Sequence, residues 1–356
     1  MKRPARLACV TRLARLAQVL ALALLLCLGL LCLPGCEPEP KKPEAIRIGV
    51  TFGVDATERW PLEQHYMHER AKELGVHLES RITTSSNPAM QYRQCEALLD
   101  SGVDAIIVMS RDFPALRDAY DKARKMGVKI VCYTRMPLGH EPPDLFVGFD
   151  NFLVGRAMGQ FLGELVPAGD YIILRGDADD TDARDIELGV RDGLPQLDKE
   201  IRVICNDAIA QWSPAEVRKV VRAAVLHNNG KVDAILAPTD QMAEASLQAL
   251  ADIGFTGTVP ITGFMAELEA IHRLREGTQS MTILPDYRQL ARVAVEQAVQ
   301  LAQGKAPRSN VAYDMGNGRK VDALLLPCQV ITPQNIESRI IAPGVYTRHQ
   351  VYGDKR

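Results

Sequence analysis

The sequence contains none of the short motifs that mark nucleotide-binding or hydrolytic enzymes. No GxxxxGK(S/T) loop is present and no GxGxxG turn follows a strand-like run, so no phosphate-binding loop is predicted. There is likewise no GxSxG or HExxH motif, and the seven histidines are scattered. His65 and His68 share a predicted helix face, but no third ligand accompanies them, which favours surface histidines over a metal site. We therefore expect no catalytic residues, no metal and no cofactor.

Paired cysteines are also lacking. None of the eight cysteines forms a CxxC pair, and four of them lie in the first 36 residues. Cys132 and Cys205 lie in apolar strand-like runs and Cys95 lies on a helix face, which favours buried thiols. A metal site or a disulfide is the alternative.

The amino-terminal segment has basic residues but no acidic ones. Five Lys and Arg side chains precede an apolar run from about residue 16 to residue 33, which is typical of a bacterial export signal. A retained anchor helix is the alternative, because the run approaches the roughly 20 apolar residues that span a bilayer. The run ends in Leu33-Pro34-Gly35-Cys36, which resembles the lipobox of bacterial lipoproteins, although Pro34 is unusual there. We predict a signal peptide over residues 1–35, a lipid on Cys36 and a Pro-rich linker over residues 36–44.

Removal of this signal changes the charge balance. The 42 basic and 44 acidic residues become 37 and 44, so the exported chain is acidic. No basic stripe remains to neutralise phosphates, which disfavours binding to nucleic acid. The length left for folding exceeds what one hydrophobic core usually holds, so two lobes are expected.

From residue 46 onward, apolar runs of strand length alternate with segments of helical period. This alternation predicts βαβ units around parallel sheets, and hence an α/β protein with two doubly wound parallel-sheet lobes. In such sheets ligands bind beyond the carboxyl ends of the strands. The predicted strands are residues 46–50, 77–83, 105–109, 129–133, 146–149, 171–174, 202–205, 234–236, 261–264 and 281–284.

The chain has only two tryptophans, Trp60 and Trp212, and both follow predicted strands. An indole ring offers an apolar face to the C–H face of a sugar ring, so each is a candidate wall of a carbohydrate site. The alternative is that each fills the core of a lobe. Arg59 beside Trp60, and Asp55 shortly before, disfavour a core-directed loop at the first tryptophan.

Several local motifs together resemble one known family. They resemble, in order, the landmarks of periplasmic xylose-binding proteins of ABC transporters, members of the type I periplasmic binding protein superfamily. The resemblance covers about residues 46–340 and implies two lobes joined by a three-segment hinge. It places residues 45–148 and 286–323 in one lobe, and residues 149–285 and 324–356 in the other. The motifs are Glu58-Arg59-Trp60, Tyr133-Thr134-Arg135-Met136, Phe149-Asp150-Asn151, Trp212-Ser213-Pro214-Ala215-Glu216 and Gly277-Thr278-Gln279-Ser280-Met281-Thr282.

The resemblance implies roles for individual residues. Arg59 and Arg135 match arginines that hydrogen-bond sugar hydroxyls, and a guanidinium presents fixed donors suited to this role. Trp60 and Trp212 match opposing aromatic walls. These four residues are the first part of the expected site.

Other positions depart from the family pattern. Thr134 stands where the family has Asp, Thr239 stands for Asn before Asp240, and Met265 stands for a ligand-binding Asp. Asp182 falls close to a ligand-binding Asn and is, with Asp179, Asp180 and Asp240, a candidate replacement acceptor. A solvated acidic loop is the alternative for the aspartates around Asp182. Because an acceptor is lost at Met265, we expect a ligand other than D-xylose to bind most tightly.

The resemblance also implies the function. A small polar, sugar-like ligand is expected to draw the two lobes together about the hinge. The expected partner is the permease of an ABC importer, and the alternative is a sensor kinase or chemoreceptor ectodomain. An enzyme on the same fold is disfavoured by the missing motifs. The expected location is the periplasm or the cell surface, with the lipid on Cys36 in the membrane.

Overall fold

The computed structural model describes residues 45–53, 59–83, 88–110, 113–136, 141–194, 199–255, 257–315 and 318–353. All of these belong to one compact unit, Ala45–Arg356. The predicted signal peptide, Cys36 and the linker lie outside the described residues. Within the described ranges, no helix has the length and hydropathy needed to cross a bilayer.

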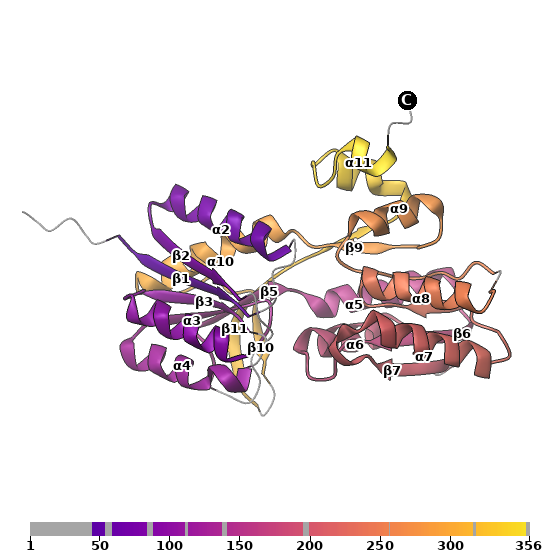
Figure 1. The fold of residues 1–356 in the computed structure, drawn as a ribbon, viewed down its shortest axis with the longest axis horizontal. Coiled ribbons are helices and arrows are strands. Elements are labelled where there is room, and N and C mark those ends of the chain that lie inside the picture. The colour runs from indigo at the N-terminus through magenta and orange to yellow at the C-terminus, as the bar shows by residue number, and fades with distance from the viewer. Residues whose placement is uncertain are drawn as a thin grey trace, which may run out of the picture. The chain divides into compact units, whose positions relative to one another are not determined.

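A seven-stranded sheet, here called the large sheet, contains the first five strands and two late ones (Figure 1). Its order is β10-β11-β5-β4-β3-β1-β2, and only β10 runs antiparallel to its neighbour. The central strands are apolar runs without alternation because both faces of the sheet are covered. The strands are β1 (Arg47–Phe52), β2 (His77–Ile82), β3 (Ala105–Met109), β4 (Lys129–Tyr133), β5 (Leu145–Phe149), β10 (Val311–Asp314) and β11 (Lys320–Leu326).

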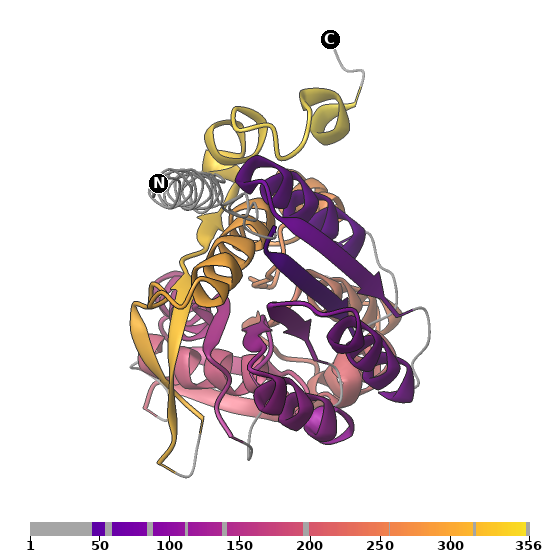
Figure 2. The ribbon, with the colours of Figure 1, turned by 90° about the vertical axis from the view of Figure 1, so that its left-hand side faces the viewer.

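Two pairs of helices cover the large sheet. One face packs against α2 (Arg59–Leu74) and α10 (Tyr287–Ala302), which lie side by side in Figures 1 and 2. The other face packs against α3 (Pro88–Asp100) and α4 (Phe113–Met126). The two cores thus lie on opposite sides of one sheet, as in doubly wound proteins.

A three-stranded parallel sheet, here called the small sheet, has the order β7-β6-β8. Its strands are β6 (Gly169–Arg175), β7 (Ile201–Ala208) and β8 (Ala234–Leu236). One face packs against α5 (Asn151–Leu165) and α6 (Thr181–Gly193), and the other against α7 (Pro214–His227) and α8 (Asp240–Asp252).

Glycines bring α5 and α6 into backbone contact. A Cβ on Gly155 would lie 1.9 Å from the carbonyl oxygen of Ile186, and one on Gly189 would lie 2.0 Å from that of Phe152. No larger residue fits at either position unless the helices separate. The two helices therefore pack without side chains between them at these points.

The remaining elements follow the small sheet in the chain. Strand β9 (Thr282–Leu284) pairs antiparallel with β12 (Gln329–Ile331), so two late segments of the chain run side by side. Helix α9 (Leu268–Glu276) packs with α11 (Arg348–Tyr352) and the π-helical turn Glu337–Ile341 around a small apolar core. The short 3₁₀ turns Ala210–Trp212 and Pro333–Asn335 complete the described elements.

Two details differ from the predicted strands. Residues 261–264 make only one β-bridge, between Ile261 and Ile235. The Thr262 hydroxyl contacts both the N–H and the carbonyl of Ala237 at 2.9 Å, so a side chain makes bonds that a longer ladder would have made. The late strands β10, β11 and β12 were not predicted. Strands β10 and β11 belong to the large sheet. The predicted lobe division stays a prediction.

Candidate ligand-binding site

Residues that follow the strands of the two sheets meet at one place. Arg135 follows β4 of the large sheet, and Asp180 lies between β6 and α6 of the small sheet. The Arg135 Nη2 atom lies 3.2 Å from the Asp180 carboxylate. The same carboxylate caps α6 by accepting the Asp182 N–H at 3.0 Å, and it accepts the Trp212 indole N–H at 3.2 Å. Asp180 therefore holds three predicted site residues together.

Trp212 is held in an unusual backbone conformation. Gln211 and Trp212 both have positive φ angles, 54° and 55°, a region that costs energy for residues other than glycine. The Gln211 N–H donates to the Asp177 carboxylate at 2.5 Å, which fixes the turn. The indole ring lies against Gly176, where a Cβ would come within 2.2 Å of it. Trp212 is half-buried, so part of the ring stays exposed.

Asp182 has a side chain without a partner among the described residues. Its side-chain oxygens make no hydrogen bond or ion pair within the described part of the chain, and the residue is partly exposed. Loss of hydration, followed by the charge of Asp180, raises the pKa of Asp182 well above its usual value. Arg135 and, more weakly, Arg59 oppose this increase. Arg59 at the start of α2 therefore belongs to the same electrostatic group as Asp182.

A second contact joins the same parts of the chain. The Tyr313 hydroxyl in β10 donates to Asp185 at 2.6 Å and accepts from Arg184 at 2.9 Å. Both partners lie on α6, so the helix that carries Asp182 is tied to the edge of the large sheet.

Arg59 and Trp60 lie at the first turn of α2. The Arg59 Nε atom donates to Glu63 at 2.5 Å, and the guanidinium carbon lies 4.1 Å from the centre of the Trp60 ring. Trp60 is only 9% exposed and packs against Phe52 in the core of the large sheet. The structure thus favours the core alternative for Trp60, and its role as a ligand wall stays a prediction.

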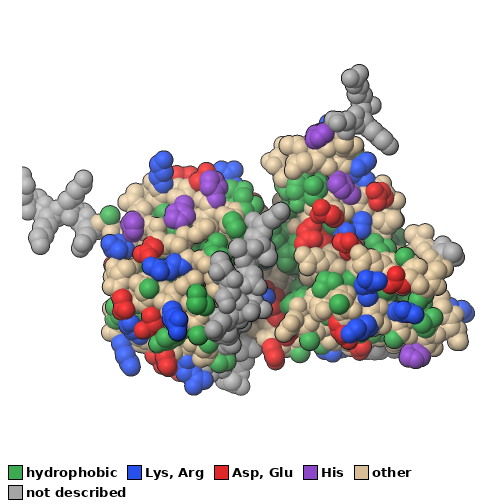
Figure 3. Space-filling view, viewed as in Figure 1, with side chains coloured by type: hydrophobic (Ala, Val, Ile, Leu, Met, Phe, Trp, Pro, Cys, Tyr) green, Lys and Arg blue, Asp and Glu red, His purple; other side chains and the backbone are tan. Residues whose placement is uncertain are grey.

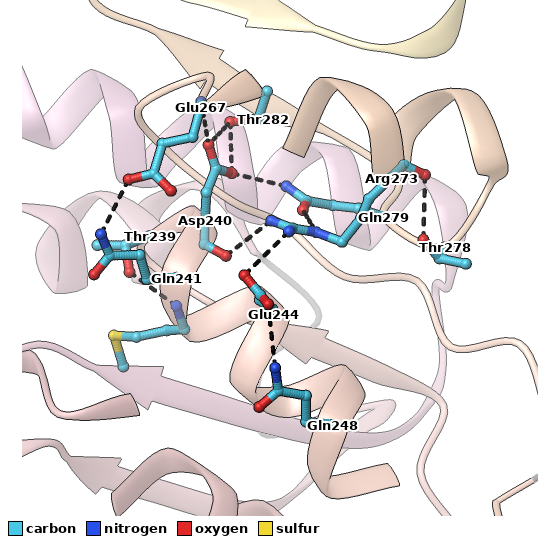
Figure 4. A network of polar contacts seen from close by, with 11 residues as sticks. Thr239, Asp240, Gln241, Glu244, Gln248, Glu267, Arg273, Thr278, Gln279 and Thr282 are labelled. Carbon is cyan, nitrogen blue, oxygen red and sulfur yellow. Dashed lines mark hydrogen bonds and ion pairs between the residues drawn. The ribbon is translucent and has the colours of Figure 1, made fainter. Parts of the chain in front are cut away.

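Thr239 and Asp240 are used within the protein. The Thr239 hydroxyl caps α8 by accepting the Met242 N–H at 3.2 Å. Asp240 is completely buried, and Figure 4 shows its carboxylate among donors from two later segments of the chain. These donors are the Gln279 side-chain amide at 2.8 Å, the Thr282 hydroxyl at 2.8 Å and the Glu267 N–H at 3.0 Å. Direct contact of Thr239 or Asp240 with a ligand stays a prediction that these geometries do not support.

Burial and hydrogen bonding shift the pKa of Asp240 in opposite directions. Loss of hydration raises the pKa of Asp240 to about 7, although the bonds from Gln279 and Thr282 favour the ionised form. The nearest cationic side chain in Figure 4 is Arg273, which bonds the Asp240 carbonyl oxygen at 3.0 Å instead of the carboxylate. No ion pair compensates the buried charge among the described contacts.

Met265 lies in a strained turn next to this network. Its φ angle is 108° and that of Ala266 is 49°. The Ala266 N–H donates to the Thr282 hydroxyl at 3.2 Å, so the Asp240 network holds the turn. The Tyr287 hydroxyl, at the start of α10, contacts the Met265 sulfur at 2.8 Å. Met265 is therefore positioned between the small-sheet region and the large-sheet helix α10.

A model of the periplasmic binding protein domain matches residues 48–306, which is more than half of the chain. The chain belongs to the periplasmic binding protein family. This membership confirms the suspected family and supports a binding protein instead of an enzyme.

The proteins similar to this chain include two D-xylose-binding periplasmic proteins. The one from Escherichia coli strain K12 is 29% identical, covering 86% of this chain and 92% of the relative. The one from Haemophilus influenzae is 27% identical with the same coverage. Among solved structures, an ABC transporter solute-binding protein from Clostridium phytofermentans with bound β-D-glucose matches with a TM-score of 0.78. It is 24% identical, and the match covers 86% of this chain and 99% of that one. The predicted α/β fold class is confirmed.

Sequence reasoning gave no binding role to several residues of the candidate site. The hydroxyls of Ser110 after β3 and Thr134 after β4 are buried and have no partner within the described part of the chain. Ser110 directly follows a predicted strand. It could have been predicted as a site residue, because ligands bind beyond the carboxyl ends of parallel strands. Tyr287 lies three residues after the predicted strand 281–284, so the same reasoning could have included it. Glu63 carries no such signal, because it lies well beyond the end of a predicted strand.

A cavity lies apart from these residues. It has a volume of about 430 Å³, lies between α6 and the edge strand β7, and contains no predicted site residue. Its lining is Ile173, Glu187, Val190, Arg191, Val203, Ile204, Cys205, Asn206 and Asp207. We do not assign the ligand to it, because it lies beside the strands and not beyond their carboxyl ends.

Proposed function

We propose that this protein is an exported receptor that captures a monosaccharide or a sugar-like polyol and delivers it to an ABC importer. The observation that carries the proposal is the meeting of Arg135, Asp180 and Trp212 beside the unpartnered carboxylate of Asp182. An aromatic face, guanidinium donors and a free acceptor are the groups that bind sugar rings.

The charges in the site favour a neutral ligand. Arg135 is paired with Asp180, and Arg59 is paired with Glu63, so the two cations are already compensated. Uncharged hydroxyls of a ligand can donate to Asp182 and accept from the guanidinium groups without adding net charge. The unpartnered hydroxyls of Ser110 and Thr134 add further donors and acceptors.

The relatives support this class of ligand and this partner. The two curated relatives are named for D-xylose, and the matched structure is a solute-binding protein of an ABC transporter with bound glucose. We further propose that Met265 shifts preference away from D-xylose, because its thioether replaces an acceptor and already contacts Tyr287.

Calorimetry on the exported form tests the proposal. The panel contains D-xylose, D-glucose, D-ribose, deoxy sugars, furanoses and cyclic polyols. We expect at least one of them to bind with a Kd in the micromolar range or below, and D-xylose not to be the tightest. Asp182→Ala should weaken binding by about 10-fold to 100-fold, because a ligand hydroxyl loses its acceptor. Asp192→Ala, at an exposed carboxylate later on α6, is the matched control. Binding that is equal in both variants would contradict the site.

The proposed location is the outer face of a membrane. We propose that Cys36 becomes the first residue and carries lipid, which holds the receptor near its importer. Fractionation of cells that express Cys36→Ser should move the protein from the membrane to the soluble fraction. A variant that stays attached with residues 1–35 uncleaved would support an anchor helix.

A further inference from the structure

The guanidinium of Arg59 has three close neighbours. Its carbon lies 4.1 Å from the centre of the Trp60 ring and 4.4 Å from that of Tyr287, so it makes a cation–π contact with each of two aromatic rings. The Nε atom on its inner edge donates to Glu63 at 2.5 Å. This arrangement fixes the plane of the group as well as its position.

Glu63 is fixed in turn. It lies one helical turn after Arg59 on α2, and its side chain has no exposed surface. Its other carboxylate oxygen accepts the hydroxyl of Tyr133, the last residue of β4. Burial alone would lower the pKa of Arg59, but the charge and hydrogen bond of Glu63, together with Tyr287 and Tyr133, outweigh burial and raise that pKa. Glu63 therefore holds a permanently charged arginine.

Tyr287 is fixed by packing on its far side. Its ring meets Phe149 edge-on at 5.8 Å, and its hydroxyl contacts the Met265 sulfur. The ring is thus supported independently of Arg59. It makes the second cation–π contact of the Arg59 guanidinium.

The outer edge of the guanidinium stays unused. Within the described residues, neither terminal nitrogen of Arg59 makes a hydrogen bond, and the side chain is 23% exposed. Two adjacent N–H groups in one fixed plane match two neighbouring oxygen atoms of a ligand.

We propose that Glu63 and Tyr287 are positioning residues that make Arg59 a fixed two-pronged donor for a pair of neighbouring ligand hydroxyls. The inference rests on the proposed capture of a carbohydrate. A free arginine loses rotamer freedom when it binds a ligand, whereas this arginine has lost that freedom on folding. This arrangement of Arg59, Glu63 and Tyr287, here called the clamp, therefore adds affinity only for ligands that present both oxygens together.

Nuclear magnetic resonance of the ligand-free protein gives a test that needs no sugar. The side-chain Nε–H signal of Arg59 should exchange slowly with water and show a rigid order parameter. Arg222, exposed on α7, should show a fast, mobile signal. Glu63→Gln and Tyr287→Leu should make Arg59 mobile, while Tyr287→Phe, which keeps the ring, should leave it rigid. An Arg59 as mobile as Arg222 in the wild type would overturn the clamp.

Binding gives the second readout, with the tightest sugar of the panel and its monodeoxy analogue that lacks one of two neighbouring hydroxyls. Glu63→Gln and Tyr287→Leu should each weaken binding of the parent sugar about tenfold or more, but weaken the analogue less than threefold. Equal losses for both ligands would overturn the inference, since a purely structural defect affects them alike.

Matched controls on α2 separate clamping from general damage. Glu73→Gln removes an exposed carboxylate paired with Arg292, and Tyr66→Leu removes a ring beneath Arg288. Neither should change the Arg59 signal or the ratio of the two affinities. If no sugar of the panel binds the wild type while Arg59 is rigid, the proposed carbohydrate function is wrong and the positioning of Arg59 stands. If a sugar binds while Arg59 is mobile, the proposed function stands and the positioning of Arg59 is wrong.

Discussion

Among the residues that the structure describes, two carboxylates are completely buried, and they are accommodated differently. Glu63, beside the large sheet, faces the guanidinium of Arg59 and the hydroxyl of Tyr133. Asp240, at the start of α8 beside the small sheet, faces only neutral donors from Gln279, Thr282 and a backbone N–H. The first charge is cancelled by a partner, and the second is only solvated by the protein.

The difference decides what each network can do. An ion pair with aromatic walls fixes one side chain, Arg59, at the surface of the predicted site. A hub of neutral donors fixes backbone, because the Thr282 hydroxyl and the Asp240 carboxylate also bond the N–H groups of Ala266 and Glu267. Figure 4 shows that this hub gathers segments distant in the sequence. Only the hub should depend on pH near neutrality.

The largest expected effect follows removal of the partner from the ion pair. Glu63→Ala leaves Arg59 half-buried without a counter-charge and should lower the free energy of unfolding by about 3 to 5 kcal/mol. Urea unfolding measures it. The double variant Arg59→Met, Glu63→Leu should recover most of the loss, because apolar groups need no counter-charge. If the double variant is no more stable than Glu63→Ala, the loss comes from packing.

The next effect concerns pH. The pKa of Asp240 is about 7 in the folded protein against 3.8 for a free side chain, so the folded state binds the extra proton between these values. Its contribution to stability is therefore complete below pH 4 and is lost as the pH rises through 7, by at most about 4 kcal/mol. Asp240→Asn should flatten this part of the stability curve in urea titrations at several pH values. Asp252→Asn, at the exposed far end of α8, should keep the wild-type slope.

Single donor deletions sharpen the comparison. Tyr133→Phe removes one donor from Glu63 and should cost about 1 kcal/mol, because the ion pair remains. Thr282→Val removes the donor to Asp240 and the acceptor of the Ala266 N–H, and should cost about 2 to 3 kcal/mol. Thr282→Val should also extend the pH-dependent loss of stability to higher pH, since the hydrogen bond from Thr282 lowers the pKa of Asp240. Equal costs and equal pH slopes would remove the distinction between the two networks.

The smallest effect has the opposite sign. Met265→Gly relieves a backbone with φ of 108° but removes a half-buried side chain, and the net gain in stability should be about 1 kcal/mol. Thermal unfolding measures it, and calorimetry should show weaker ligand binding in the same variant. A loss of stability would mean that the Asp240 hub does not hold a strained turn.

Much of the fold was predictable from local pattern. The parallel strands of both sheets are short apolar runs between helices, and predicted 105–109 and 129–133 coincide with β3 and β4. Strands β10 and β11 were missed because they are not continuous apolar runs and carry charged residues, as in Lys320–Leu326. The pairing of β11 with β5 joins segments distant in the sequence. Such pairing has no local signal.

The site was predictable only in part. Arg135, Asp182 and Trp212 follow strands and lie together, as the rule of strand ends requires. Trp60 follows a strand too, yet it lies in the core, because Phe52 and Arg59 cover it. Asp240 was expected to face the ligand, and its burial depends on Gln279 and Thr282, some 40 positions later. Contacts between such distant residues are set by tertiary packing alone.

Figure 3 shows acidic and basic side chains interspersed on the face it presents, in keeping with the absence of a basic stripe in the sequence. Such mixed surfaces keep a receptor soluble and place little demand on individual positions. The positions that tolerate little substitution thus lie inside the protein and not on this surface.

The glycine contact between α5 and α6 has an evolutionary consequence. Asp180 and Asp182 stand at the amino end of α6, so the place of the acceptors depends on a helix pair that tolerates no added carbon at Gly155 or Gly189. Side chains around the proposed ligand can be exchanged one at a time without moving this helix pair. We expect proteins that descend from this chain to change the ligand that they bind while they keep these two glycines. The helix pair should therefore be retained longer than the preference for any one ligand.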